Sequence, residues 1–204
     1  MKKKIVLSIF IILISFTQNS CGSKRISKKI IVASSGKIES LDPARANTLK
    51  AIQLISSLGD TLYELNSDGE LIPELAPGTP IISKDRLQIT INLRKNVFFH
   101  DGTTFNSNAI KFTFDRFKRI GTMNYILGNK IKSIVTPSEY SVIINLNKPS
   151  SSLNGLLPSV NLTPISPTFY KQYSDKFLNE KFVGTGKYMP VSYTHLTLPT
   201  RAVV

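Results

Sequence analysis

The sequence contains few of the residues on which metal and nucleophilic chemistry depend. Its 204 residues include no tryptophan, one cysteine and two histidines. A zinc site takes about four ligands, mostly His and Cys, and this inventory does not supply them. A single cysteine cannot form a disulfide within the chain. We therefore expect no metal site, no cofactor and no disulfide-stabilised fold.

Acidic residues are also scarce, with 13 Asp and Glu against 26 Lys and Arg, for a formal net charge of +13. Such a charge raises the question of nucleic acid as a partner. The basic residues are spread along the chain, however, with short clusters only at 2–4 and 24–29, and no nucleic-acid-binding motif accompanies them. We expect no nucleic-acid partner. A basic protein close to an anionic membrane fits the charge equally well.

The first twenty residues have the pattern of a secretory signal peptide. Three lysines at 2–4 precede the apolar run IVLSIFIILISF at 5–16. About twelve apolar residues are too few to span about 30 Å of hydrocarbon comfortably, but they match the apolar core of a signal peptide. We predict a signal peptide over 1–20 and therefore an exported protein.

Cys21 follows this signal directly, in the stretch QNSCGS. The stretch resembles a bacterial lipobox, in which the cysteine is lipidated and becomes the new N-terminus. Gln18 departs from the pattern, since Leu is usual there. The resemblance implies a lipid anchor at Cys21 and a basic tether over 21–29 on a membrane surface. The alternative is an incidental free cysteine after ordinary signal cleavage.

The mature part of the chain alternates helix and strand patterns. We predict a first strand at 28–35, a helix from Thr48 as N-cap with apolar residues recurring from Leu49 to Leu62, and a tight turn at Asp68-Gly69. The clearest strand lies within 86–105, where Leu87, Ile89, Ile91 and Leu93 alternate with polar residues.

The second half continues this alternation. A helix is expected from Asn106 or Ser107 to about Arg119, with an inward face of Ile110, Thr113, Phe114 and Phe117. Residues 130–152 read as strand, turn and strand, with the turn at Pro137-Ser138. The mixed order of elements predicts an α/β fold with a mixed sheet.

No group of residues in this region forms a recognisable catalytic site. His100 has no second ligand nearby in the sequence, and His100-Asp101-Gly102 reads as a turn in which Asp101 accepts backbone N–H groups. Gly184-Thr185-Gly186 lacks the spacing of a phosphate-binding loop and reads as a tight turn. The acidic residues Asp60, Glu64, Glu70 and Glu74 look like solvated surface. We expect a protein that is not an enzyme.

Several stretches, in order, resemble extracytoplasmic solute-binding proteins of the peptide/nickel ABC-transporter family. They are SLDPA at 40–44, LIPELA at 71–76, LQITINLRKNVFFHDGTTFNSNAIKFTFDR at 87–116, LNKPSSSL at 146–153 and FVGTGKY at 182–188. The resemblance covers about residues 30–190. The chain departs from the family at 108–110, where an Asp-Val pair is common, and at Lys187, where Pro is common.

The resemblance implies a periplasmic-binding-protein-like clamshell of two lobes that close on a solute and deliver it to a membrane permease. Proteins of this family are usually over twice as long as this chain, so residues 30–190 would be part of the first lobe. Oligopeptides are the expected solute, and the family also includes nickel, haem, glutathione and oligosaccharide binders. The resemblance also leads us to expect a monomer. From the loops at 45–48 and 121–127, we select as ligand-facing residues Asn47, Met123, Asn124 and Tyr125.

Two other functions stay open. The chain could be a membrane-tethered lipoprotein that acts as a scaffold or chaperone, or a hydrolase with Tyr193 and His195 in its site. No nucleophile, base and orienting group accompany that pair. The resemblance ends just before residues 191–204, and codons for VSYTHLTLPT can spell a string similar to a transposase sequencing adaptor. We therefore expect this tail to be non-native.

Overall fold

The structure, a computed structural model, describes residues 30–33, 38–127, 130–149 and 155–192. The predicted signal peptide, Cys21, its tether and residues 193–204, including Tyr193 and His195, lie outside these residues. The chain divides into two units, Met1–Gly36 and Lys37–Val204. In the first unit only 30–33 are described, and they do not form the strand predicted at 28–35: Ile30, Ile31 and Val32 are exposed. A strand needs a neighbouring backbone to bond, and no described strand pairs with this segment.

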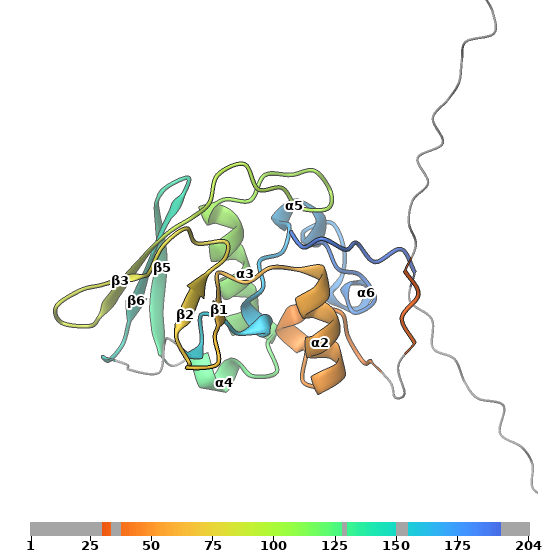
Figure 1. The fold of residues 1–204 in the computed structure, drawn as a ribbon, viewed down its shortest axis with the longest axis horizontal. Coiled ribbons are helices and arrows are strands. Elements are labelled where there is room, and N and C mark those ends of the chain that lie inside the picture. The colour runs from red at the N-terminus through yellow and green to blue at the C-terminus, as the bar shows by residue number, and fades with distance from the viewer. Residues whose placement is uncertain (1–29, 34–37, 128–129, 150–154, 193–204) are drawn as a thin grey trace, which may run out of the picture. The chain divides into compact units, whose positions relative to one another are not determined.

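The larger sheet of the second unit has four strands in the order β3-β4-β6-β5 (Figure 1). These are β3 (Ile81–Ile82), β4 (Gln88–Asn92), β5 (Ile131–Ser138) and β6 (Ser141–Leu146). Helices and strands are interspersed, as the α/β class predicts. Every described strand pair is antiparallel, so the described strands do not form the mixed sheet that was expected. Short hairpins join β1 to β2, β3 to β4 and β5 to β6, and a short connection allows only antiparallel pairing. The pair β4–β6 is joined instead through a long connection that contains α3, α4 and β5.

The alternation predicted for the central strand is confirmed. Ile89 and Ile91 are buried and lie opposite Ile144 and Val142 of β6. The turn between β5 and β6 is at Glu139-Tyr140, so the prediction of a turn at Pro137-Ser138 was wrong. Pro137 lies inside β5, where the register shifts between Val135 and Ser138. An edge strand tolerates proline at such an irregularity, since no neighbour needs its missing N–H.

Helix α3 (Ser107–Ile120) packs against this sheet (Figure 1). Asn106 is its N-cap, accepting the N–H groups of Asn108 and Ala109, and the predicted inward face is buried. The larger core joins α3 to the sheet through residues such as Ile110, Phe114 and Ile144. The short helix α4 (Asn124–Leu127) follows α3.

Helix α2 (Leu49–Leu58) begins at the predicted cap, where the Thr48 hydroxyl accepts the N–H of Ala51. It ends at Leu58, four residues before the apolar pattern does. Gly59 then packs so closely that a Cβ there would lie 2.6 Å from both Thr163 and Phe182.

The two-stranded hairpin β1 (Tyr63–Leu65) and β2 (Leu71–Pro73) turns at Asp68-Gly69 as predicted.

The remaining elements are short. They are the 3-10 turns η1 (Pro43–Arg45) and η3 (Val160–Leu162) and the helices α5 (Pro167–Tyr170) and α6 (Asp175–Leu178). A second apolar core joins α2 to this region through Ile55, Ile165, Leu178 and Phe182. Among the described residues, no helix combines the length and apolar character needed to cross a bilayer.

Candidate functional site

The two loops selected from the sequence, 45–48 and 121–127, lie side by side in the structure. The backbone N–H of Thr122 donates to the carbonyl of Ala44, at 3.0 Å. This bond connects η1, which leads directly into the first loop, to the loop between α3 and α4. The two loops, which were predicted separately, are therefore linked through a backbone hydrogen bond and are named here the loop pair.

Side-chain hydrogen bonds hold the first loop of the pair in one conformation. Asp42 accepts the N–H of Ala44 and begins η1, while Thr48 begins α2. From the far side, the amide of Asn161 donates to the carbonyls of Pro43 at 2.7 Å and Ala46 at 2.8 Å. The Pro43 carbonyl also accepts the N–H of Ala46, at 3.2 Å, so Asn161 adds a second bond there. At Ala46, Asn161 supplies a bond to a carbonyl of irregular backbone, which must otherwise find another partner.

A buried ion pair anchors the same loop to α3. Both terminal nitrogens of Arg116 donate to the Asp42 carboxylate at 2.6 Å, and these side chains are 3% and 0% exposed. Burial alone would lower the pKa of Arg116, but the bonds and charge of Asp42 raise it overall. Arg116 also lies 5.2 Å from the ring centre of Tyr170 and donates to Asp175 at 3.2 Å. The loop pair thus rests on a fixed, neutralised support.

The four selected residues differ in what they offer a ligand. Asn47 is exposed, and Tyr125 is 68% exposed with its hydroxyl 3.8 Å from the sulfur of Met123. Met123 is half-buried against the larger core, and Asn124 donates to the carbonyl of Lys118 at the end of α3. Asn47 and Tyr125 are therefore accessible to a solute, while Met123 and Asn124 have packing and capping roles.

A hollow of about 330 Å³ opens beside the end of α2. Its lining residues are Ser56, Gly59, Thr61, Glu64, Leu65, Glu74, Gly155, Pro158, Ser159 and Val160. Glu74 is not the solvated surface residue expected from the sequence: it is half-buried and accepts both the N–H and the hydroxyl of Thr61, at 2.8 and 3.0 Å. Desolvation raises the pKa of Glu74 even though these bonds oppose it.

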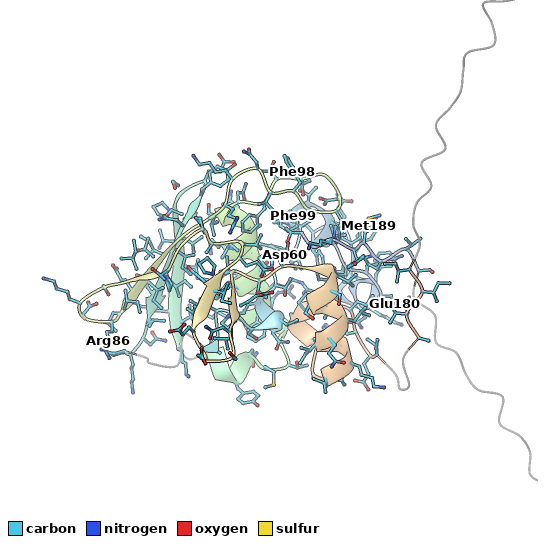
Figure 2. All side chains as sticks on the ribbon, in the orientation of Figure 1. Asp60, Arg86, Phe98, Phe99, Glu180 and Met189 are labelled. Atoms are coloured by element: carbon cyan, nitrogen blue, oxygen red, sulfur yellow. The ribbon has the colours of Figure 1, made fainter. Side chains whose placement is uncertain are left out.

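The neighbouring Asp60, in the segment between α2 and β1 (Figure 2), is also engaged. Its carboxylate accepts the hydroxyl of Thr185 at 2.9 Å. Thr185 belongs to the Gly184–Gly186 turn, and the N–H of Gly186 donates to the carbonyl of Leu58. The turn therefore packs on the end of α2, as a structural turn rather than a phosphate-binding loop.

His100 and Asp101 also have structural partners. The Nε2 of His100 lies 2.8 Å from the Gly186 carbonyl, while Nδ1 accepts the N–H of Gly184. Asp101 accepts the N–H of Thr103, as predicted, and the hydroxyl of Ser166. Burial alone would raise the pKa of Asp101, but the bonds from Ser166 and Thr103 lower it overall. Among the described residues, no three His, Cys, Asp or Glu side chains form a group that could hold a metal ion.

Sequence reasoning missed three residues of this region: Asp42, Arg116 and Asn161. Arg116 follows Ala109 by seven positions and Thr113 by three, so helical spacing already placed it on the inward face. A charge at such a position indicates a buried partner, because an unpaired charge is rarely buried. No comparable signal identifies Asn161, whose partners are backbone carbonyls more than a hundred residues away.

Comparison with known proteins gives consistent matches over most of the chain. The family model of bacterial extracellular solute-binding proteins, family 5 (middle region), matches residues 70–198. The glutathione-binding protein GsiB of Pectobacterium atrosepticum is 31% identical over 169 residues, which are 82% of this chain and 32% of that protein. The chain thus spans about a third of the length of the curated relatives it matches.

Solved structures show the same fold. OppA of Listeria monocytogenes bound to peptide matches with a TM-score of 0.68 at 21% identity, over 75% of this chain and 34% of that one. NikZ of Campylobacter jejuni in complex with Ni(L-His) matches with a TM-score of 0.67 at 25% identity, over 78% and 32%. These likenesses confirm a partial periplasmic-binding-protein fold. The chain belongs to family 5 of the bacterial extracellular solute-binding proteins, the family that serves peptide/nickel ABC transporters.

Proposed function

We propose that this chain forms part of the substrate-binding component of an ABC importer, which captures a solute outside the cytoplasmic membrane for delivery to a permease. Its membership of a family of solute-binding proteins carries the proposal. The loop pair supports it from the structure, because two surface loops far apart in sequence are joined and held by buried bonds. Such preorganisation reduces the entropy that ligand binding would otherwise cost.

A short peptide is the solute class that the observations favour. The GsiB relatives bind glutathione, itself a tripeptide, and the OppA structure holds a peptide. A peptide presents amide N–H and C=O groups, and the Asn47 amide can both donate to and accept from such groups. The exposed ring of Tyr125 can cover an apolar side chain.

The loop pair would then supply part of one wall of a cleft. We propose that residues 30–190 belong to the first lobe, and that a second lobe closes over the solute. In such a clamshell the ligand favours the closed state because it contacts both lobes there. Because a single wall makes only part of the contacts, residues 30–190 by themselves should bind the solute weakly. We also propose that the protein is a monomer.

Lipidation of Cys21 would keep this component at the membrane surface. Mass spectrometry of the mature protein from a bacterial host tests the proposal, and diacylglyceryl-cysteine at the new N-terminus is the expected result. A mature protein that begins at another residue would contradict the proposal. So would a Cys21→Ser variant that is released from membranes no more readily than the native protein.

Titration of the full chain with glutathione and with trialanine, followed by NMR or calorimetry over the millimolar range, tests the solute class. We expect weak saturable binding, reduced about five- to tenfold by Asn47→Ala or Tyr125→Ala, since one hydrogen bond or ring contact contributes about 1 kcal/mol. The controls are Asn108→Ala and Tyr188→Ala, which change exposed residues of the same types elsewhere. If the two control variants weaken binding as much as Asn47→Ala and Tyr125→Ala do, the proposed role of the loop pair is disproved.

A further inference from the structure

A row of aromatic side chains lies partly in solvent on α5, α6 and the segment between them. The ring centres of Phe169 and Tyr173 are 4.9 Å apart, and those of Tyr173 and Phe177 are 4.5 Å apart and stacked. Tyr173 and Phe177 are each 43% exposed. These three residues are named here the aromatic ladder. Neighbouring rings that stay partly exposed form a small apolar patch, and such a patch is available to a partner.

Lysines border the aromatic ladder. The ammonium of Lys181 lies 5.8 Å from the ring centre of Phe177, and that of Lys171 lies 5.6 Å from the ring centre of Phe112. Lys176, on α6, is exposed. Long basic side chains that extend along aromatic rings keep their charges at the outer rim of an apolar patch.

A hollow of about 330 Å³ opens next to the ladder. Its lining residues are Phe112, Arg116, Arg119, Tyr170, Lys171, Tyr173, Ser174 and Asp175. Three of these are basic and one is acidic. Arg116 is neutralised by Asp42, but the Arg119 side chain is 64% exposed at the opening, beside Lys171. Guanidinium and ammonium groups over a hollow are suited to a phosphate oxygen.

Two carboxylates also belong to this face, and its basic residues outnumber them. Asp175 is shared among Arg45, Arg116 and Arg119, at 3.9, 3.2 and 3.4 Å. Glu180, just beyond α6 (Figure 2), is exposed next to Lys181. The three lysines and the free donor capacity of Arg119 leave the face positive.

We propose that this aromatic–basic face, formed by α5, α6 and the adjoining part of α3, binds the anionic surface of a phospholipid membrane. At such a surface aromatic rings lie at the level of the headgroups, and lysines meet lipid phosphates. A free anion would fill the hollow and leave the ladder in water. A second copy would bring like charges together, so charge complementarity favours the membrane over self-association.

The chain's length permits this contact. Between Cys21 and Ile38 the backbone extends at most about 60 Å, which is enough for a unit anchored at Cys21 to lay any face on the bilayer. The proposal does not depend on solute binding, and its test leaves the solute untouched.

The absence of tryptophan from the chain allows a direct measurement. Tyr173→Trp in the full chain places a single fluorescent reporter in the ladder, and Tyr125→Trp places one on α4 as the matched control. The apolar run at 5–16 is the same in both variants, so it brings both to vesicles equally. Phe177→Trp replaces Tyr173→Trp if the latter does not give a cooperative urea unfolding transition.

With vesicles of equal phosphatidylglycerol and phosphatidylcholine, we expect the indole emission of Tyr173→Trp to shift to shorter wavelength and to be quenched by brominated acyl chains. The emission of the Tyr125→Trp control should stay unchanged. High salt should abolish the response of the ladder reporter, and so should adding K171E, K176E and K181E together. Each lysine near an anionic surface contributes about 1 kcal/mol, or about fivefold in affinity.

Three results would overturn the proposal. The first is a ladder reporter whose emission does not respond to these vesicles, or responds equally to pure phosphatidylcholine. The second is a shift without vesicles that grows with protein concentration, which would show that a second copy covers the face. The third is the same shift with inorganic phosphate alone, which would identify a site for a free anion.

Discussion

Arg116 of α3 and Asp42 of the η1 loop form a two-bond ion pair at 2.6 Å, with both side chains almost completely buried. The pair joins residues 74 positions apart. It connects the SLDPA and FDR stretches, which the sequence presents as separate motifs. The loop that it holds carries Ala44, whose carbonyl joins the two loops of the pair.

Asp42→Asn should strongly destabilise the protein, because it removes the buried counter-charge of Arg116 and leaves only the partly exposed carboxylate of Asp175, at 3.2 Å. We expect the free energy of unfolding to fall by about 3–5 kcal/mol, as measured by urea titration. The control is Lys111→Ala, which breaks the exposed pair between Lys111 and Asp115 and should cost about 0.5 kcal/mol or less. Similar losses in the two variants would show that burial does not determine the value of the Asp42 pair.

Asn161→Ala should loosen the η1 loop, since it removes the donor to the carbonyls of Pro43 and Ala46. We expect a loss of about 1–3 kcal/mol in the free energy of unfolding. Amide hydrogen exchange should also rise at Thr122, whose acceptor Ala44 lies in that loop. Asn108→Ala, on the exposed side of α3, serves as the control, and protection at Thr122 that is unchanged in Asn161→Ala would contradict the prediction.

Glu74→Gln tests the half-buried carboxylate. The folded protein raises the pKa of Glu74 above its ordinary value, so this residue contributes stability that is fully present below the unfolded-state pKa. That contribution is lost as the pH rises through the folded-state pKa. The stability of Glu74→Gln relative to the native chain should therefore increase over that range and level off above it. Urea titrations from pH 4 to 8 measure the difference, and a difference that decreases with pH would refute the assignment.

Gly186→Ala should disrupt the packing of the Gly-Thr-Gly turn on α2. A Cβ at Gly186 would lie 2.5 Å from the backbone carbon of Leu58, and backbone cannot move aside as a flexible side chain can. We expect the free energy of unfolding to fall by about 1–3 kcal/mol, as measured by thermal or urea unfolding. Gly78→Ala is the matched control, because a Cβ there meets nothing within 4 Å. Equal stability of the two variants would show that the turn adapts freely.

Local patterns predicted the main elements well. The caps at Thr48 and Asn106, the alternation of β4 and the inward face of α3 are confirmed, because each depends on side chains within a few positions of one another. The turn at Pro137 was placed wrongly because proline marks either a turn or an irregular edge strand, and only the partner strand distinguishes the two.

The sequence by itself determined the α/β class, the family and the two loops that we propose to face a solute, since these follow from local spacing and recognisable motifs. Only the tertiary structure decided how those loops meet. It also showed that Arg116 is buried against Asp42, that Glu74 is partly desolvated, and that the aromatic ladder and its lysines share one face. The Arg116–Asp42 pair joins residues 74 positions apart, and such long-range contacts leave no periodic signal in the sequence. The residues of the ladder are close in sequence, but a local pattern does not show whether their rings face solvent or the core.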